Sequence, residues 1–198
     1  MSQGEQQGPK EPRSLASGQL YRLAWVFYLL LAVAAVVWLG AREGTIPLSL
    51  FVRWPGAVID LGLDLAAGLA LVGLWSLARS AFESARQLEE ELRRLLGAVE
   101  PAEVVALALL SGFAEELFFR GAVQSAFGWL VATVLFTVLH TGSGRAFRLW
   151  TLFAAIAGLI FAGLVVWRQS LLSAMVAHMV VNAVNLRHLA VAREVDAS

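Results

Sequence analysis

The chain has 198 residues, of which 59% are hydrophobic and 15% are charged, and its formal net charge is zero. Soluble domains are about 45–50% apolar and about 25% charged, so both figures indicate a membrane protein. A zero net charge argues against nucleic acid as a partner. The sequence contains no cysteine, which excludes thiolate metal sites and leaves the redox compartment open.

The N-terminal half of the chain predicts two membrane-spanning helices and a surface helix. Residues 1–19 are rich in Gln, Gly, Pro and Ser, which indicates a disordered tail. Residues 20–100 then contain two long apolar runs, at 21–40 and 56–78, each long enough to span a bilayer. In residues 79–97 apolar side chains recur every three or four positions between charged ones. This pattern predicts an amphipathic helix that lies at the membrane surface, binds a partner or serves as a solvated connector.

The C-terminal half, residues 101–187, predicts four more spans, and residues 188–198 a second tail. The fourth span is unusual, because it comprises only the twelve residues from Trp129 to His140, whereas a full crossing needs about 20. A Thr-Gly-Ser-Gly segment follows it, which disfavours an uninterrupted helix. Irregular backbone at membrane depth is tolerated where it is buried in protein or lines a wet cavity. We therefore expect an all-α bundle of about six transmembrane helices with a water-accessible cleft next to His140.

The placement of arginine and lysine predicts the orientation of the bundle. Cytoplasmic loops carry an excess of these residues, and here they are concentrated on the side that holds both termini. That side has Lys10, Arg13, Arg22, Arg79, Arg86, Arg93, Arg94, Arg145, Arg148, Arg187 and Arg193, and the other side has Arg42, Arg53 and Arg168. Both termini are thus expected in the cytoplasm. The Ala- and Arg-rich composition is typical of bacteria and indicates a bacterial cytoplasmic membrane.

Several polar residues fall inside the apolar C-terminal segments. A charge at bilayer depth costs at least about 2.5–3.5 kcal/mol, so intramembrane ionisable residues usually mark a functional site. At a rise of about 1.5 Å per residue, four of them lie about 12–18 Å from the non-cytoplasmic helix ends. These four are Glu115, His140, His178 and Asn182. Three different helices can therefore present them at a common level. Asp60 and Asp64, near the start of the second span, are expected to face the interface, as is His188.

Spacing within the helices predicts separate roles for these side chains. Glu116 and Arg120 are four residues apart on one helix face, which favours an ion pair. Glu115 is rotated by about 100° from Glu116 and has no obvious cation, which suits a general base. His178 and Asn182 also share a face, as expected of two hydrogen-bond donors directed at one oxyanion.

Three motifs in this half resemble those of the CPBP family of intramembrane proteases, which includes the CAAX prenyl endopeptidases and the bacterial Abi-type, bacteriocin-processing proteins. The segment 115–120 reads Glu-Glu-Leu-Phe-Phe-Arg and resembles the Glu-Glu-x-x-x-Arg motif. Residues 136–140 resemble Phe-x-x-x-His, and residues 178–182 resemble His-x-x-x-Asn. The resemblance covers residues 101–186.

This resemblance implies a glutamate-dependent intramembrane endopeptidase. Glu115, aided by His140, would activate water, and His178 and Asn182 would stabilise the tetrahedral oxyanion. The resemblance gives supporting roles to Glu116 and Arg120. Family members have been described as metalloproteases, and two histidines with a glutamate can bind zinc. The His-Glu-x-x-His signature is absent from the sequence, so metal-free activation without a cofactor is favoured.

The implied substrate is a peptide or a membrane-anchored protein, cleaved near the membrane. A prenylated C-terminus, a bacteriocin or pheromone leader and a C-terminal sorting helix all remain open, and a bacterial source disfavours the first. Two other functions stay in view. A transporter or proton relay also uses intramembrane Glu and His, although six spans without a repeat match inverted-repeat transporters poorly. A non-catalytic immunity factor or scaffold of the same family is the other alternative.

Overall fold

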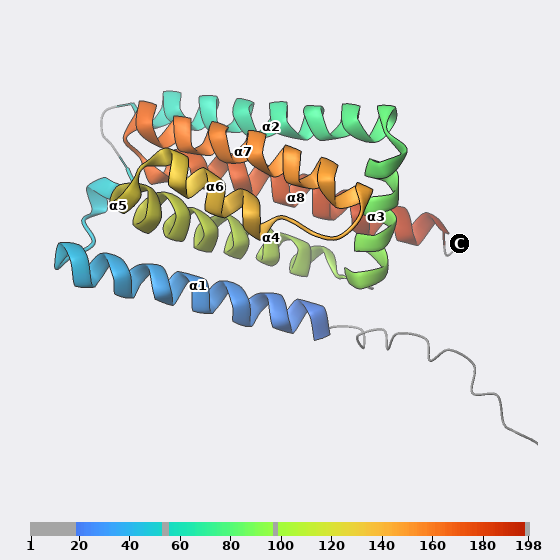
Figure 1. The fold of residues 1–198 in the computed structure, drawn as a ribbon, viewed down its shortest axis with the longest axis horizontal. Helices are drawn as coiled ribbons and strands as arrows, with labels where there is room; N and C mark the ends of the chain where they lie inside the picture. The colour runs from blue at the N-terminus through green and yellow to red at the C-terminus, as the bar shows by residue number, and fades with distance from the viewer. Residues whose placement is uncertain (1–18, 53–55, 97–98, 197–198) are drawn as a thin grey trace, which may run out of the picture.

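The computed structural model describes residues 19–52, 56–96 and 99–196, and the regular structure in these ranges is entirely helical. Figure 1 shows long helices lying side by side along the long axis, with α3 across one end. The elements are α1 (Gln19–Glu43), η1 (Leu48–Leu50), α2 (Ala57–Ala81), α3 (Glu83–Leu96), α4 (Pro101–Glu116), the π-helical segment η2 (Leu117–Gln124), α5 (Ser125–Phe127), α6 (Trp129–Leu139), α7 (Arg145–Arg168) and α8 (Leu171–Asp196). The predicted tail at 1–19 lies almost wholly outside the described residues.

Within the described ranges, three helices are long and apolar enough to cross a membrane: Tyr21–Glu43, Ala57–Ala81 and Arg145–Arg168. A fourth candidate arises if α3 and the helix from α4 to α5 count as one bent span. These helices make the chain an integral membrane protein. The six predicted spans exceed this number for two reasons. The helix α6 is short, and the helices α4–α5 and α8 carry polar residues that lower their apolar character.

Close helix contacts in the bundle depend on glycine. A Cβ atom at Gly68 of α2 would lie 2.8 Å from the backbone oxygen of Ala177 in α8. A Cβ atom at Gly112 of α4 would lie 2.7 Å from the Cγ of Met179, also in α8. Membrane helices commonly use small residues in this way, because they bring two backbones together. Both α2 and α4 therefore pack directly against α8.

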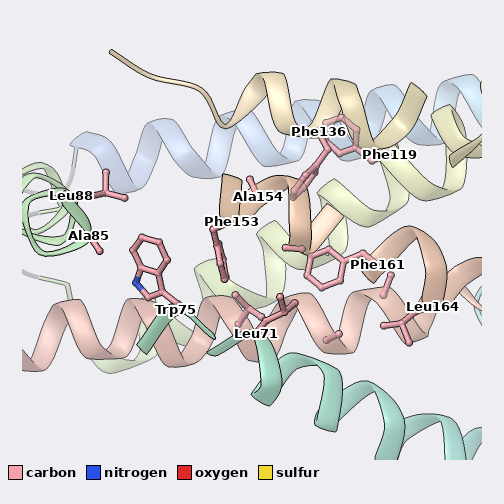
Figure 2. Close-up of a cluster of buried hydrophobic side chains, with 14 of the residues drawn as sticks. Leu71, Trp75, Ala85, Leu88, Phe119, Phe136, Phe153, Ala154, Phe161 and Leu164 are labelled. Atoms are coloured by element: carbon pink, nitrogen blue, oxygen red, sulfur yellow. The ribbon is translucent and has the colours of Figure 1, made fainter. Parts of the chain in front are cut away.

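The amphipathic helix α3 covers one end of the bundle. Its apolar residues Ala85 and Leu88 are fully buried in the main hydrophobic cluster, near Trp75 of α2 (Figure 2). On the same face, the buried Glu89 accepts hydrogen bonds from the indole of Trp75 (3.1 Å) and from Arg79 (3.3 Å). The apolar face of α3 thus packs against the bundle itself. The sequence left open whether this helix lies at the membrane surface, binds a partner or serves as a solvated connector.

The structure corrects the boundaries of two predicted helices. The amphipathic helix begins at Glu83, not at 79, because Phe82 adopts an extended conformation (φ −121°, ψ 125°) that ends α2 and turns the chain. At the C-terminus α8 continues to Asp196, so most of the segment 188–198, expected to be a tail, is helical. The sequence did not indicate the sharp corner at Phe82, which follows from the packing of α3 across the end of the bundle.

Asp60 and Asp64 do not face the interface as expected. They lie one turn apart on the buried side of α2, and Asp64 is only 2% exposed. Arg168 at the end of α7 forms an ion pair with Asp60. The arginine compensates the charge of that carboxylate inside the bundle, which explains why an acidic residue is tolerated there.

We predict that Gly68→Ala destabilises the bundle, because its new methyl group collides with backbone atoms of α8. The matched control is Gly73→Ala in the same helix, where nothing lies within 4 Å of the added Cβ. Alanine favours helix over glycine by about 1 kcal/mol, so the control should be neutral or stabilising. Thermal unfolding in detergent measures both variants, and equal melting temperatures would contradict the predicted contact.

Candidate active site

The two adjacent glutamates occupy the last turn of α4, immediately before the π-helical segment η2. Both are buried, with Glu115 6% and Glu116 0% exposed. The wider hydrogen-bonding pattern of a π-helix is rare and is frequently found at functional sites. Neither spacing nor composition indicates this π-helical segment.

Glu116 forms the predicted ion pair with Arg120. The Nη1 atom of Arg120 lies 3.1 Å from Oε1 of Glu116, and both side chains are inaccessible to solvent. The guanidinium also donates a 3.1 Å hydrogen bond to the carbonyl oxygen of Gly158 in α7. It further lies over the ring of Phe136, 4.5 Å from the centroid, in a cation–π contact. These contacts tie η2 to α6 and α7.

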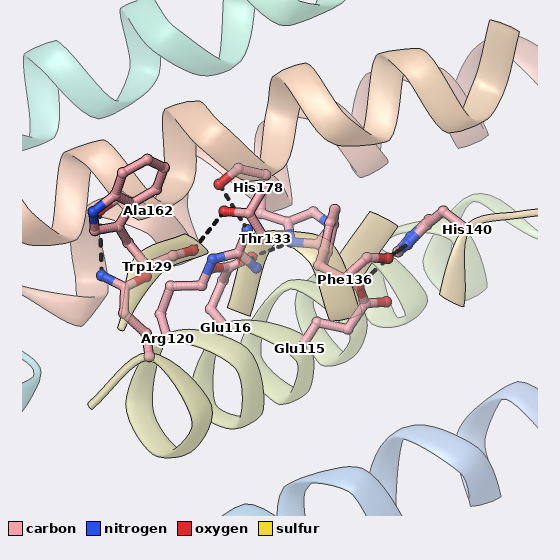
Figure 3. A network of polar contacts seen from close by, with 11 residues as sticks. Glu115, Glu116, Arg120, Trp129, Thr133, Phe136, His140, Ala162 and His178 are labelled. Carbon is pink, nitrogen blue, oxygen red and sulfur yellow. Dashed lines mark hydrogen bonds and ion pairs between the residues drawn. The ribbon is translucent and has the colours of Figure 1, made fainter. Parts of the chain in front are cut away.

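The same carboxylate holds His178 of α8. The ring nitrogen Nδ1 of His178 lies 2.7 Å from Oε1 of Glu116, the oxygen that Arg120 also contacts (Figure 3). The imidazole stacks on Phe161 of α7, with ring centroids 4.9 Å apart and planes 18° apart. A carboxylate oxygen accepts, so Nδ1 carries the hydrogen, and Nε2 is the nitrogen left for other contacts.

The side chain of Glu115 faces His140, whereas Glu116 contacts Arg120 and His178. The Nε2 atom of His140 lies 3.8 Å from Oε2 of Glu115, longer than a hydrogen bond (Figure 3). This Oε2 atom has no hydrogen-bond partner among the described residues. The other ring nitrogen of His140 lies 2.8 Å from the carbonyl oxygen of Phe136 and must therefore carry the hydrogen. The remaining ring nitrogen, Nε2, is the one directed toward Glu115.

The amide of Asn182 contacts a residue that the sequence analysis missed. Its Nδ2 group donates a 2.8 Å hydrogen bond to Oγ of Ser111, a buried side chain on α4. Ser111 precedes Glu115 by four residues and so shares its helix face, which is the only signal that the sequence offered. The bond fixes the orientation of the amide and leaves its second N–H free.

These side chains meet in one cavity of about 390 Å³. Glu115, His140, His178 and Asn182 all line it, whereas Glu116 and Arg120 lie behind its wall. Most of the remaining lining is apolar and comes from α3, α7 and α8, and Tyr28 of α1 also contributes. The expected cleft next to His140 is therefore present, and α3 forms part of its boundary.

The residues do not form a three-ligand zinc site. In the described part of the chain, no three His, Asp or Glu side chains are grouped so that they could hold a metal ion. Two of the candidate ligands, His178 and Glu116, are instead hydrogen-bonded to each other through Nδ1 of His178. Catalytic zinc needs three protein ligands around an open position, which this geometry does not supply.

We predict that Arg120→Met lowers the free energy of unfolding by about 3–5 kcal/mol, because it leaves the Glu116 carboxylate buried without its cation. The double variant Glu116→Gln/Arg120→Met removes both charges and should recover most of this loss. Chemical denaturation of the purified variants in detergent provides the comparison. Equal losses in the single and double variants would show that the charge of Glu116 is not what Arg120 stabilises.

Comparisons with known proteins relate part of the chain to a described family. Residues 98–184 match the family described as Type II CAAX prenyl endopeptidase Rce1-like. The chain is also 36% identical over 83 residues to the uncharacterized protein YpbD of Bacillus subtilis (strain 168). That alignment covers 41% of this chain and 42% of YpbD, so the chain spans less than half the length of this relative. No solved structure matches the chain.

The matched segment begins just before α4 and ends within α8, so it contains every residue of the three motifs. Residues 98–184 therefore form a domain of the Rce1-like type II CAAX prenyl endopeptidase family.

Proposed function

We propose that the chain is an intramembrane endopeptidase that uses Glu115 and His140 to activate a water molecule. The main support is the carboxylate of Glu115, whose Oε2 has no hydrogen-bond partner in the described residues and lies 3.8 Å from His140 in the wall of a cavity. At this separation both groups can contact one water molecule beside them. A buried carboxylate with one such oxygen next to a histidine suits proton abstraction.

In the proposed reaction, the water oxygen attacks the carbonyl carbon of the scissile peptide bond. A new C–O bond forms as Glu115 takes the proton from the water, and the carbonyl π electrons move onto its oxygen. His140 would contact the same water molecule and orient it, so that a lone pair of the water oxygen points at the carbonyl carbon. The product of this step is a tetrahedral oxyanion.

The oxyanion would be bound by His178 and Asn182. Nδ1 of His178 already donates to Glu116, so Nε2 can donate to the oxyanion in the doubly protonated form of the ring. The second N–H of Asn182 provides another donor, since the first is bonded to Ser111. Glu116 and Arg120 do not line the cavity, and their role would be to hold His178 in place. Such preorganised donors commonly supply the largest share of transition-state stabilisation.

Collapse of the intermediate completes the cycle. The electron pair of the oxyanion re-forms the C=O bond, the C–N bond breaks, and the leaving nitrogen takes the proton held by Glu115. The products are a carboxylic acid and an amine. Glu115 returns to its carboxylate form, so no cofactor is consumed.

The topology that suits this reaction has six spans, formed by α1, α2, α4–α5, α6, α7 and α8. We place both termini in the cytoplasm, in keeping with the excess of arginine and lysine on that side. The amphipathic α3 then lies at the cytoplasmic end, where it bounds the cavity. The substrate would be a peptide or membrane-anchored protein whose apolar segment fits this largely apolar chamber.

We predict that Glu115→Gln abolishes substrate cleavage, lowering its rate by about 10²–10⁴-fold because amide groups cannot accept the proton. Glu91→Gln, which changes an exposed glutamate of α3, is the matched control and should retain full activity. Because the substrate is unidentified, the measurement compares peptide termini in membrane fractions from cells that express either variant or the wild type. Termini present with wild type and Glu91→Gln but lost with Glu115→Gln identify the substrate.

Two results would contradict the proposal. If the three membrane fractions contain the same termini while the wild-type chain still produces a cellular phenotype, the chain acts as a scaffold or immunity factor. If Glu115→Gln instead changes proton or solute flux in reconstituted vesicles without changing any terminus, the chain is a transporter or relay.

We predict that Asn182→Ala lowers kcat by about 10²–10³-fold with a smaller effect on KM, because the lost donor acts mainly on the oxyanion. The assay uses a peptide that spans the cleavage site found in the preceding comparison. Retained kcat with a raised KM would instead indicate that Asn182 binds the substrate in its ground state.

A further inference from the structure

The helix α3 covers one end of the bundle and lies outside the matched segment 98–184 (Figure 1). It also bounds the cavity that contains Glu115. Four residues of α3 line that cavity: Glu89, Leu92, Leu95 and Leu96. We propose that α3 is a lid that the substrate displaces and that Glu89 is the latch that holds this lid closed. The effect of the lid on turnover rests on the proposed function, whereas access to the cavity can be measured without it.

Glu89 is a buried carboxylate that joins α3 to two other helices. Its side chain is 5% exposed. Its Oε1 atom accepts hydrogen bonds from Nε1 of Trp75 (3.1 Å) and Nη1 of Arg79 (3.3 Å), both in α2. Its Oε2 atom lies 3.6 Å from Nε2 of His188 in α8 and 3.7 Å from Nη2 of Arg93 in α3 itself. One side chain thus connects the lid to both α2 and α8.

The burial of this carboxylate favours two positions of α3, one closed and one open. In the closed position Glu89 has its donors, and the fully buried Ala85 and Leu88 pack α3 against the bundle. A small outward shift would take the carboxylate away from Trp75 and Arg79 before water replaces them, and a buried charge without its partners is costly. A larger shift exposes the carboxylate to water and removes that cost. Packed contacts with two favoured arrangements can act as switches.

The corner at Phe82 provides a pivot for this movement. Phe82 is extended between α2 and α3, so the two helices are not one continuous rod, and hinges commonly lie at the ends of helices. Next to the corner, Arg86 donates hydrogen bonds to the carbonyl oxygens of Arg79 (3.0 Å) and Ser80 (3.4 Å). At about 1.5 Å per residue, Arg86 lies about 6 Å from the corner and Leu96 about 21 Å from it. The far end of α3, which lines the cavity, therefore moves most.

Because the sequence contains no cysteine, a single introduced thiol can report the opening of α3. Ala154→Cys places this thiol on α7 in the cavity wall, at a position that is 3% exposed. In lipid nanodiscs, a water-soluble maleimide labels it in proportion to the open fraction. Adding Glu89→Gln removes the charge of the latch, and a hydrogen bond to a charged group corresponds to a factor of about 10–100. We expect labelling to accelerate by that factor, and an unchanged rate would overturn the latch.

Two controls separate the opening of the lid from a general loosening of the bundle. Glu91→Gln removes an exposed glutamate of the same helix and should leave the labelling of Ala154→Cys unchanged. Ala35→Cys places the thiol at a fully buried position in the cluster formed by α1, η2 and α8. Its labelling should be equal with Glu89→Gln and with Glu91→Gln. If Glu89→Gln accelerates the labelling of both thiols by the same factor, it destabilises the whole bundle and the latch is overturned.

A second variant tests the latch from α8. The side chain of His188 is 40% exposed, so His188→Ala is expected to fold even if Glu89→Gln does not. Exposed contacts contribute little, and we expect labelling of Ala154→Cys to accelerate by about 2–5-fold. Because His188 acts through Glu89, combining the two substitutions should give no acceleration beyond that of Glu89→Gln. Either an unchanged rate in His188→Ala or multiplicative effects in the combined variant would overturn the latch.

Kinetics connect the lid to the proposed reaction. A peptide chain that enters past α3 keeps the helix displaced, so its apparent affinity rises with the open fraction. Glu89→Gln should therefore lower KM for the peptide that spans the cleavage site, with kcat nearly unchanged, and Glu91→Gln should change neither. Faster labelling with an unchanged KM would overturn the role of α3 as the entrance for substrate. Faster labelling in a chain that cleaves no substrate would support the lid and overturn the proposed function instead.

Discussion

The buried Glu116 carboxylate is the interaction on which the candidate site depends. Its Oε1 atom is shared by Arg120 and His178, which belong to η2 and α8, and Arg120 reaches on to the backbone of Gly158 in α7. Isolated charges in a membrane interior are costly, so each of these groups persists only because the others compensate it. The resulting network joins the four helical segments α4, η2, α7 and α8 around one point. Glu116 and Arg120 hold the His178 ring in the cavity wall, although neither of them lines the cavity.

The two adjacent glutamates illustrate how one helix can place like residues in unlike environments. Glu116 is fully buried and bonded to two nitrogen donors, whereas Glu115 faces His140 across a gap longer than a hydrogen bond. The difference follows from a rotation of about 100° between successive helical residues, which points one side chain at α8 and the other into the cavity. The π-helical segment η2 begins directly after this pair. A structural ion pair and a chemically available carboxylate thus coexist at neighbouring positions.

The elements outside the matched family segment form part of the same cavity. The helix α1 supplies Ala24 and Tyr28, and α3 supplies Glu89 and several leucines. Gly68 gives α2 a close contact with α8, the helix that also carries His178 and Asn182. The cavity is therefore a property of the whole bundle rather than of residues 98–184 alone. Its walls are mostly apolar, and a few polar side chains lie among them.

The sequence alone determined the helical class, the short fourth helix and the Glu116–Arg120 pair, because periodicity and spacing within a single helix specify these features. Contacts between helices were decided by the tertiary structure. Spacing did not reveal that His178 bonds to Glu116 or that Ser111 holds Asn182, since each contact joins residues far apart in the chain. The burial of Asp60 likewise depends on Arg168, a partner from a different helix. A polar residue at bilayer depth can be recognised in the sequence, but the packing of other helices determines its partner.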